Sequence, residues 1–482
     1  MNPSITVDEI SMRPKLSFLS SADKEKINAA ALQILSEIGI KNFQDETLTL
    51  LKDAGCSETD DRMIKIPAGL VQQALASAPS NILIYNREGV KAMDLGGHRS
   101  YYGTGSDLIY SLDSNSVQRR RSLLADVIRA AKVADALPNL DFIMSFANPS
   151  DFDPRQGYLR SFQAMAANSI KPIVCTADNR NDLSAMWQIA CILRGSEDAL
   201  RAKPYAIYYG EPVSPLKFPV ESMDKLLFCA EKSIPAIFSP APIAGSTAPM
   251  TVAGHVAQGL AESLAGLVIH QLKARGAPFI MGMGPAVLDM VTGQCSYNAP
   301  EYLLSYLAII EMSHYYNLPN WGYAGTSDSQ VPDGQATFEA GLLTFLAEMA
   351  GSNLNHDVGY LDFGLTGSLE MVVILDEIIN QVRRLSRGIP VNDETLAVEV
   401  IRQVGADGNF LAHLHTLQHL ESTQWRPKLI SRMGNDKWRA SGSTTMQKRA
   451  QRKLEKILHE HQPVPVPEEQ AGQIQKIVDQ FF

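Results

Sequence analysis

Cysteine and basic side chains are scarce in this 482-residue chain. The five cysteines form no C-x-x-C pair and lie far apart in the sequence: Cys56, Cys175, Cys191, Cys229 and Cys295. This pattern is typical of reduced, buried thiols and not of a disulfide framework. Because the formal net charge is -9, a surface that neutralises phosphate groups is not favoured, and we expect no nucleic-acid partner.

Long hydrophobic runs are also missing. The first 20 residues contain no apolar segment of the kind found in signal peptides. The most apolar run, 251–272, is interrupted by His255, Gln258, Glu262 and His270. We therefore expect no membrane span and a cytoplasmic location.

Several catalytic motifs are absent. The sequence has no G-x-S-x-G elbow and no dinucleotide-binding fingerprint. His413, His415 and His419 form the histidine cluster, but no carboxylate or thiol is spaced to complete a zinc site, so we expect no metal. Gly103-x-Gly105 and Gly282-x-Gly284 are too short to predict phosphate binding, and close approach of the backbone at a barrel rim explains them equally well.

The chain does contain a regular alternation of strand and helix patterns. Eight short apolar runs predict strands, at 100–103, 142–147, 172–176, 205–209, 236–239, 279–283, 321–324 and 356–361. Each is followed by a helical pattern, at 123–136, 156–168, 183–193, 223–231, 252–273, 301–316, 336–350 and 369–386. Eight such units predict an α/β fold of the (β/α)8 TIM barrel type, and a doubly wound sheet is the alternative.

Two further regions flank the predicted barrel, which spans 99–389. Residues 1–98 predict an N-terminal cap of helices with a small β region. Residues 390–482 predict a C-terminal helical extension with a proline-rich linker at 462–467. Such an extension is compatible with a homo-oligomer.

Polar loops follow the predicted strands, at 103–107, 148–151, 176–179, 211–215, 240–247, 284–286 and 325–335. In a TIM barrel these loops ring one mouth, where active sites lie. The last of them concentrates hydrogen-bonding side chains from Thr326 to Gln330. Its simpler interpretation is an ordinary turn between strand and helix with Asp333 as the helix cap.

Aromatic residues lie near many of the predicted strand ends. Most of them should pack within the barrel, which buries bulky side chains. Two or three that face one cavity would form a cage for a quaternary ammonium group, whose positive charge is attracted to the π faces.

Motifs in a fixed order then point to a known family. They are the segments 102–107 (YGTGSD), 239–249 (SPAPIAGSTAP) and 325–329 (GTSDS) with Asp333 and Gln335, then 408–411 (GNFL), His415-Thr416 and 425–427 (WRP). With the N-terminal helical cap, they resemble the trimethylamine:corrinoid methyltransferase family over nearly the full length. The archaeal trimethylamine enzymes carry pyrrolysine in the barrel, whereas this chain has ordinary residues throughout, with Gln330 at or next to that position.

The resemblance is therefore to the non-pyrrolysine branch, whose members demethylate quaternary amines such as glycine betaine. It implies a TIM barrel that moves a methyl group from the amine to the Co(I) of a corrinoid (cobalamin) bound to a separate corrinoid-binding protein. Glycine betaine, giving dimethylglycine, is the expected donor. Proline betaine, carnitine or choline, and a non-catalytic betaine-binding barrel, are the alternatives.

Candidate site residues follow from the resemblance and from the chemistry of a cation. The pool for an aromatic cage is Tyr102, Tyr209, Trp321, Tyr323, Tyr360 and Phe363. Four polar residues could orient the substrate or its carboxylate: Thr326, Asp328, Gln330 and His356. Asp107 or Glu211 could complement the ammonium charge.

Overall fold

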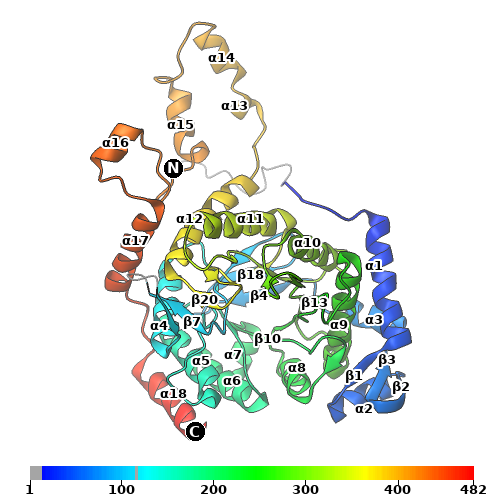
Figure 1. Ribbon diagram of the computed structural model, residues 1–482. Coiled ribbons are helices and arrows are strands. Elements are labelled where there is room, and N and C mark those ends of the chain that lie inside the picture. Colours follow the sequence, from blue (N-terminus) through cyan, green and yellow to red (C-terminus); the bar gives the residue numbers. More distant parts are fainter. Residues whose placement is uncertain (1–13, 114–117, 482) are drawn as a thin grey trace.

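A closed ring of parallel strands forms the centre of the computed structural model, which describes residues 14–113 and 118–481 (Figure 1). Four neighbouring strands are β9 (Ile173–Cys175), β10 (Ala206–Gly210), β12 (Ala236–Phe238) and β14 (Phe279–Met281). Three more are β17 (Trp321–Tyr323), β18 (Leu354–His356) and β6 (Tyr101–Tyr102). Parallel bridges Gly103–Phe142, Ile143–Ile173 and Met281–Asn320 add residues 142–143 as the eighth strand and close the circle. The predicted (β/α)8 barrel is confirmed.

Proline marks where five of these strands begin. It stands directly before β9, β12 and β14, and one residue earlier before β10 and β17: Pro172, Pro204, Pro235, Pro278 and Pro319. Proline has no N–H group that would need a partner, so the first residue of a strand tolerates it. Its carbonyl still accepts a hydrogen bond from the neighbouring strand, as from the Ile143 N–H to Pro172 O at 2.9 Å.

The barrel interior is a hydrophobic core of its own. Alternate residues point inward, among them Phe142, Val174, Ile207, Ile237, Ile280, Trp321 and Leu354. The hairpin of β4 (Ile82–Tyr85) and β5 (Lys91–Leu95) packs into the same core. Because the hairpin bonds to Pro204 and Ile170, just before β10 and β9, it closes the N-terminal end of the barrel.

Helices surround the strands (Figure 1). They are α4 (Leu124–Ala136), α5 (Gly157–Asn168), α6 (Arg180–Arg194), α8 (Val220–Lys232), α9 (Val252–Lys273), α10 (Pro300–Tyr315), α11 (Gly334–Ala350) and α12 (Leu369–Ser386), with the short α7 (Glu197–Ala202) after α6. α9 is long and apolar enough to cross a membrane by composition, but it is mostly buried and packs against α1, α3, α8 and α10. The eight predicted helices agree with those observed to within a few residues.

The N-terminal part packs outside the barrel against α9. It contains α1 (Ser21–Gln33), which continues as a π-helical turn (Ile34–Ile38), then α2 (Asp45–Asp53) and α3 (Ala68–Ser77). Its strands β1 (Ile40–Asn42), β2 (Ser57–Glu58) and β3 (Met63–Lys65) form a small sheet with β11 (Lys217–Phe218). Residues 1–13 of the predicted N-terminal region lie outside the described residues.

Short strands build up the C-terminal mouth of the barrel. They are β7 (Tyr110–Leu112), β8 (Arg119–Arg121), β13 (Ile243–Ala244), β15 (Ala286–Leu288), β16 (Cys295–Ser296), β19 (Tyr360–Leu361) and β20 (Thr366–Gly367). The single strand predicted at 356–361 was wrong, because β18 ends at His356 and β19 pairs separately with β20. Asp357 and Gly359 have positive φ angles of 74° and 101°, which interrupt the extended backbone between them.

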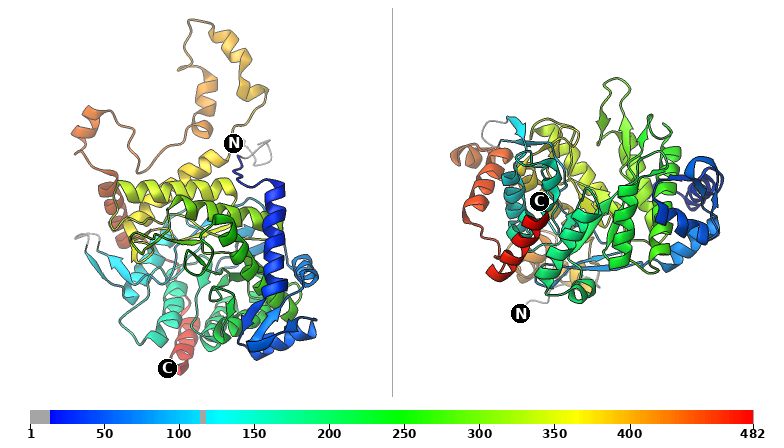
Figure 2. Two further views of the ribbon diagram at one scale, coloured as in Figure 1. Left: turned by 45° about the vertical axis from the view of Figure 1, so that its right-hand side comes forward. Right: turned by 90° about the horizontal axis from the view of Figure 1, so that it is seen from below.

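The C-terminal residues divide into a packed part and an arm. α17 (Met446–Glu460) packs on α12 and α4, and α18 (Glu468–Phe481) packs on α6 and α5. The arm comprises α13 (Asp393–Leu396), α14 (Val398–Val404), α15 (Leu414–Thr423) and α16 (Asn435–Ala440), and stands away from the barrel (Figures 1 and 2). These four helices have no buried residues, and several apolar side chains are exposed there: Ile389, Val391, Leu396, Val398, Ile401, Leu411, Leu414 and Leu417.

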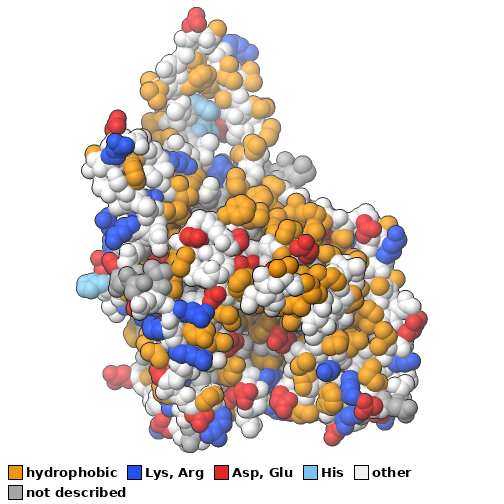
Figure 3. Space-filling view, viewed as in Figure 1, with side chains coloured by type: hydrophobic (Ala, Val, Ile, Leu, Met, Phe, Trp, Pro, Cys, Tyr) orange, Lys and Arg blue, Asp and Glu red, His pale blue; other side chains and the backbone are white. Residues whose placement is uncertain are grey.

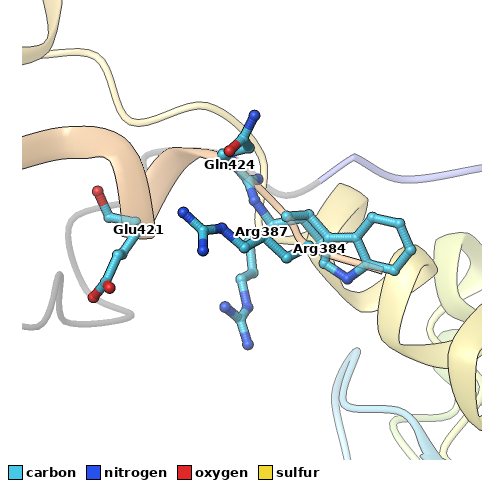
Figure 4. Close-up of a pocket in the computed structure, with 7 residues that line it drawn as sticks. Arg384, Arg387, Glu421 and Gln424 are labelled. Atoms are coloured by element: carbon cyan, nitrogen blue, oxygen red, sulfur yellow. The ribbon is translucent and has the colours of Figure 1, made fainter. Parts of the chain in front are cut away.

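A pocket of about 350 Å³ lies where the arm joins α12 (Figure 4). Arg384, Arg387, Glu421 and Trp425 are among its lining residues. Arg384 donates to the Thr423 carbonyl at 3.2 Å, and the Trp425 indole donates to Asn380 on α12. These bonds anchor the base of the arm, and the pocket is separate from the barrel mouth.

Candidate active site

The floor of the barrel mouth is aromatic. Trp321 on β17 is fully buried, and the His356 ring stacks on it with centroids 4.1 Å apart. The Tyr323 ring lies 4.5 Å from His356, and the Tyr209 ring lies 5.6 Å from Trp321. Tyr209, Tyr323 and His356 lie near the C-terminal ends of their strands, and Trp321 opens β17 one layer below them. Three different strands thus contribute to one aromatic cluster.

Further aromatic residues, which follow the barrel strands in the sequence, form the upper wall. The Tyr360 ring makes an edge contact with Phe146 at 6.3 Å, and its hydroxyl donates to the Ser106 carbonyl. Tyr297 lies 5.5 Å from Tyr302, which in turn lies 6.1 Å from Tyr323. The wall therefore continues the aromatic floor toward the mouth.

Glycines make room for these rings. A Cβ atom on Gly105 would lie 2.3 Å from both Asp357 Oδ1 and the Tyr360 hydroxyl, and one on Gly284 would lie 2.7 Å from the Tyr323 hydroxyl. Gly103 likewise leaves room for Phe142, and Gly282 leaves room for Ser239 and Trp321. The pairs Gly103-x-Gly105 and Gly282-x-Gly284 therefore allow close packing at the barrel rim, which was one of the two explanations that the sequence allowed.

We expect Gly105→Ala to destabilise the protein by about 1–3 kcal/mol, because the added methyl group must displace Asp357 and Tyr360. Gly69→Ala is the matched control, since a Cβ atom there meets nothing within 4 Å in α3. It should leave the free energy of unfolding unchanged or slightly higher. Urea denaturation of both variants measures the difference, and equal stabilities would contradict the packing argument.

Three carboxyl groups border the aromatic cluster. The Tyr209 hydroxyl donates to Glu211 Oε2 at 3.1 Å, and Ser106 Oγ donates to Asp107 Oδ2 at 2.6 Å. Glu211 is reachable from the mouth, yet the surrounding protein limits its hydration and raises its pKa. Burial also raises the pKa of Asp107, and raises that of Asp357 well above its usual range. The site is rich in acidic groups that resist ionisation.

His356 and Asp357 form a pair. His356 Nδ1 lies 2.8 Å from the Gly322 carbonyl, so this nitrogen carries the hydrogen. Burial lowers the pKa of His356 to about 3, and the ring is therefore neutral with a bare Nε2. Nε2 lies 3.2 Å from Asp357 Oδ1. This short distance and both pKa shifts are explained if Asp357 is protonated and its carboxyl group donates a hydrogen bond to Nε2 of the neutral histidine.

Backbone strain is concentrated at the mouth. Asp107, Asp357 and Phe363 have φ angles of 66°, 74° and 54°, in the left-handed region that side chains seldom adopt. Asp107 and Asp357 follow barrel strands and carry two of the carboxyl groups described above, and Phe363 follows the mouth strand β19. Residues held in such conformations cluster at functional sites, where the surrounding structure compensates for the strain.

Comparison with known proteins decides the family. The model of the trimethylamine methyltransferase (MTTB) family matches residues 3–480. The chain belongs to this family. It is 28% identical over 466 residues to the trimethylamine methyltransferase MttB of Desulfitobacterium hafniense, covering 96% of this chain and 94% of that protein. It is also 28% identical over 471 residues to a glycine betaine methyltransferase of the same species, covering 97% of each.

One solved structure is similar to the chain at a lower level of identity. The monomethylamine methyltransferase MtmB of Methanosarcina barkeri has a TM-score of 0.48 and 12% sequence identity, covering 93% of this chain and 96% of that one. The trimethylamine methyltransferase family was the one predicted from the sequence motifs, and that prediction is confirmed.

Within this family member, the structure brings most of the predicted site residues together. Tyr209, Trp321, Tyr323 and His356 share the floor, Tyr360 lies in the wall, and Asp107 and Glu211 border them. Phe363 lies on the loop between β19 and β20, half-buried. Phe363 therefore lies near the mouth, and its role as a cage residue stays a prediction.

Tyr102 does not belong to this group. Its hydroxyl donates to Glu348 on α11 at 2.7 Å, and its ring lies 5.2 Å below the Arg383 guanidinium of α12. The prediction placed it in the cage, but it points outward into the helix layer because Tyr101 takes the inward position of β6. Neighbouring residues of a strand face opposite sides, so an error of one residue reverses the side chain.

The loop after β17 has a structural role. Asp328 accepts hydrogen bonds from Ser296 and from the Tyr297 backbone N–H, so it holds the loop that carries Tyr297. Gln330 is exposed on the rim and donates to the Asp328 carbonyl at 3.1 Å. Thr326 is fully buried. Asp333 caps α11 through the Ala336 N–H, as the simpler interpretation of this loop proposed.

Sequence reasoning missed two residues of the site. Tyr297 lies on a loop beyond β16, where no periodic pattern predicts its direction. Asp357 was not among the candidate residues, although an acidic residue at the end of a barrel strand is itself a signal. Among residues 14–113 and 118–481, no group of three or more His, Cys, Asp or Glu is placed to hold a metal ion.

Proposed function

We propose that the protein transfers a methyl group from a quaternary amine to the Co(I) of a corrinoid carried by a separate protein. The observation that supports this most is the aromatic cluster of Tyr209, Trp321 and Tyr323 with carboxyl groups beside it, at the mouth of a barrel in this methyltransferase family. An ammonium group gains from both π faces and carboxylates when it is removed from water.

The residues around the cluster suit a reaction that needs positioning more than proton transfer. A quaternary nitrogen is already positively charged, so it leaves as a neutral tertiary amine when the methyl group is removed. The reaction therefore requires no general acid. The Co(I) corrinoid supplies the electron pair for the new bond to the methyl carbon, while the C–N pair stays on nitrogen. Tyr209 and Tyr323 would hold the N-methyl group toward the mouth, and the aromatic floor would exclude water.

The packing of the barrel fits a corrinoid that arrives on another protein. Below Trp321 the interior is filled by Phe142, Ile207, Ile237 and the β4–β5 hairpin. A macrocycle could therefore approach only from the C-terminal mouth, where the loops carrying β13, β15 and β16 stand around the entrance. This arrangement supports a corrinoid-binding protein as the partner.

Glycine betaine, converted to dimethylglycine, is the first donor to test because a relative named glycine betaine methyltransferase aligns with 97% of this chain. Proline betaine, carnitine, choline and trimethylamine complete the panel. We expect at least one quaternary amine to cause loss of the Co(I) absorption in the presence of the protein and free or protein-bound Co(I) corrinoid. No spectral change with any donor, at donor concentrations that saturate binding, would overturn the methyltransferase proposal.

A non-catalytic binding protein is the alternative, and the aromatic floor would serve it equally well. The same titration distinguishes the two functions. Saturable binding of a quaternary amine without any loss of Co(I) would favour the binding protein.

A further inference from the structure

The helices of the arm expose apolar side chains at helical spacing. In α14, Val398 and Ile401 lie three residues apart and both are exposed. Leu411, Leu414 and Leu417 follow at the same spacing, just before α15 and within it. Side chains three residues apart share one face of a helix, and such an apolar face normally packs on another surface. No described residue covers these faces.

The exposed apolar area of the arm is large enough for a stable interface. Leu411, Ile389 and Leu417 are 84%, 79% and 70% exposed. The eight exposed apolar side chains of the arm together present roughly 1,000 Å², whereas the largest apolar patch of a typical monomer is about 300–600 Å². A stable protein–protein interface buries about 800 Å² on each partner. The arm therefore has the surface of a chain that binds a partner.

Both ends of the arm are fixed to α12. One end continues directly from this helix. At the other end, Glu377 of α12 accepts hydrogen bonds from the backbone N–H groups of Lys428, Leu429 and Ile430 at 2.6, 2.7 and 3.1 Å. Glu377 is buried, so water competes little for these bonds. The arm thus has an anchored base and extends away from the barrel of its own chain (Figure 2).

A second apolar stripe without a partner lies on α11. Phe338, Leu342 and Phe345 occupy positions i, i+4 and i+7 of this helix, and all three are exposed. The outward face of a helix that surrounds a barrel is normally polar. Figure 3 shows hydrophobic side chains both on the arm and on the surface over α11 below it. One chain therefore carries two apolar surfaces, and neither covers the other.

We infer that the arm binds a second copy of this chain, packing its apolar faces on the α11 stripe of that copy. In a dimer with two-fold symmetry the second copy returns the same contact, so that both apolar surfaces of both chains are buried together. A different protein on the arm would leave the α11 stripe exposed, and this favours the second copy as the partner. The inference concerns assembly and goes beyond the proposed function.

Two variants test the two sides of this contact. Leu417→Asp places a charge on the arm and Phe338→Lys places one on the α11 stripe, and both side chains are exposed, so the barrel should fold as before. We expect the wild type to sediment as a dimer, or as an assembly of dimers, at micromolar concentrations. Each variant should raise the dissociation constant at least about a hundredfold, because the unpaired charge is buried twice in a two-fold interface. Val90→Asp, in the exposed turn between β4 and β5, is the matched control and should leave the constant unchanged.

Mixing the two variants tests whether the arm of one chain meets α11 of the other. A mixed dimer keeps one unsubstituted arm on one unsubstituted stripe, which neither variant has on its own. Sedimentation of an equimolar mixture should therefore show dimers at concentrations where each variant alone is monomeric. Near-UV circular dichroism shows that the packed core of each variant is intact.

Three results would overturn the inference. A wild type that sediments as a monomer would leave the arm to a different protein. Association that survives either substitution would show that the arm and α11 do not both belong to the interface. A mixture that does not recover association would show that they do not pair with each other. All of these measurements are made without donor or corrinoid, so their outcome is independent of the proposed methyl transfer.

Discussion

Replacing Tyr209 by alanine should lower kcat/KM for the quaternary amine about thirtyfold, whereas Tyr209→Phe should change it less than about threefold. The ring lies 5.6 Å from Trp321 and 6.3 Å from His356, on the wall of the space that the amine would occupy. A desolvated cation–π contact is worth about 2 kcal/mol, which corresponds to this factor. Phenylalanine keeps the π face and loses only the hydrogen bond to Glu211.

The measurement is the rate of Co(I) loss at donor concentrations well below KM. Tyr208→Phe is the matched control, because Tyr208 is the neighbouring residue of β10 but belongs to the core between strands and helices. It should leave kcat/KM unchanged. If alanine and phenylalanine at position 209 lowered kcat/KM equally, the hydroxyl and not the π face would be the important feature. Thermal unfolding of each variant shows whether the fold is intact.

The barrel was predictable because its signals are local. Apolar runs that begin after prolines such as Pro235 and Pro278 and end in polar loops predict buried strands, and six of the eight lay within about two residues of their observed positions. The run predicted at 142–147 pairs as a barrel strand only at residues 142–143. The last strand was displaced because Asp357 and Gly359 interrupt the chain with positive φ angles. A backbone reversal of this kind depends on tertiary contacts and leaves no periodic pattern in the sequence.

The site was predictable only in part. Strand-end aromatic residues such as Tyr209 and Tyr323 were found because inward positions of barrel strands meet at the mouth. Tyr102 was assigned to the wrong face of its strand, where an error of one residue reverses the direction of the side chain. Tyr297 was missed because its position depends on a hydrogen bond to Asp328 in another loop. Within the predicted C-terminal helical extension, α17 and α18 pack on the helices of the barrel, whereas the arm does not.

Binding of a cationic donor should become tighter with rising pH and should release a proton. In the free protein Asp357 is protonated over a wide range, because burial raises its pKa and the neutral His356 Nε2 accepts its hydrogen at 3.2 Å. An ammonium ion beside Asp357 favours the carboxylate and lowers this pKa. Below the pKa of the free protein, the dissociation constant should therefore fall by up to about tenfold per pH unit, and above it the constant should be flat.

The raised pKa of Asp357 has the opposite consequence for the stability of the free protein, which should fall as the pH rises. An unfolded aspartate has a pKa of about 4, so above this pH the folded protein holds a proton that the unfolded chain has released. The free energy of unfolding should then decrease as pH rises from about 4 through the raised pKa, and bound donor should restore it at high pH. Tm measured with and without choline across this range tests both signs together.

Asp357→Asn identifies the source of the proton. The amide cannot ionise but can still donate to His356 Nε2, so the variant should lose both the pH dependence of donor binding and the proton release. Calorimetry of choline binding in two buffers of different ionisation enthalpy counts the protons directly. A wild-type protein that releases none, or a variant that keeps the full pH slope, would show that Asp357 is already ionised or that another group takes up the charge. Glu211 and Asp107 are the groups then to be examined, since burial raises the pKa of both and they border the same cluster of tyrosines.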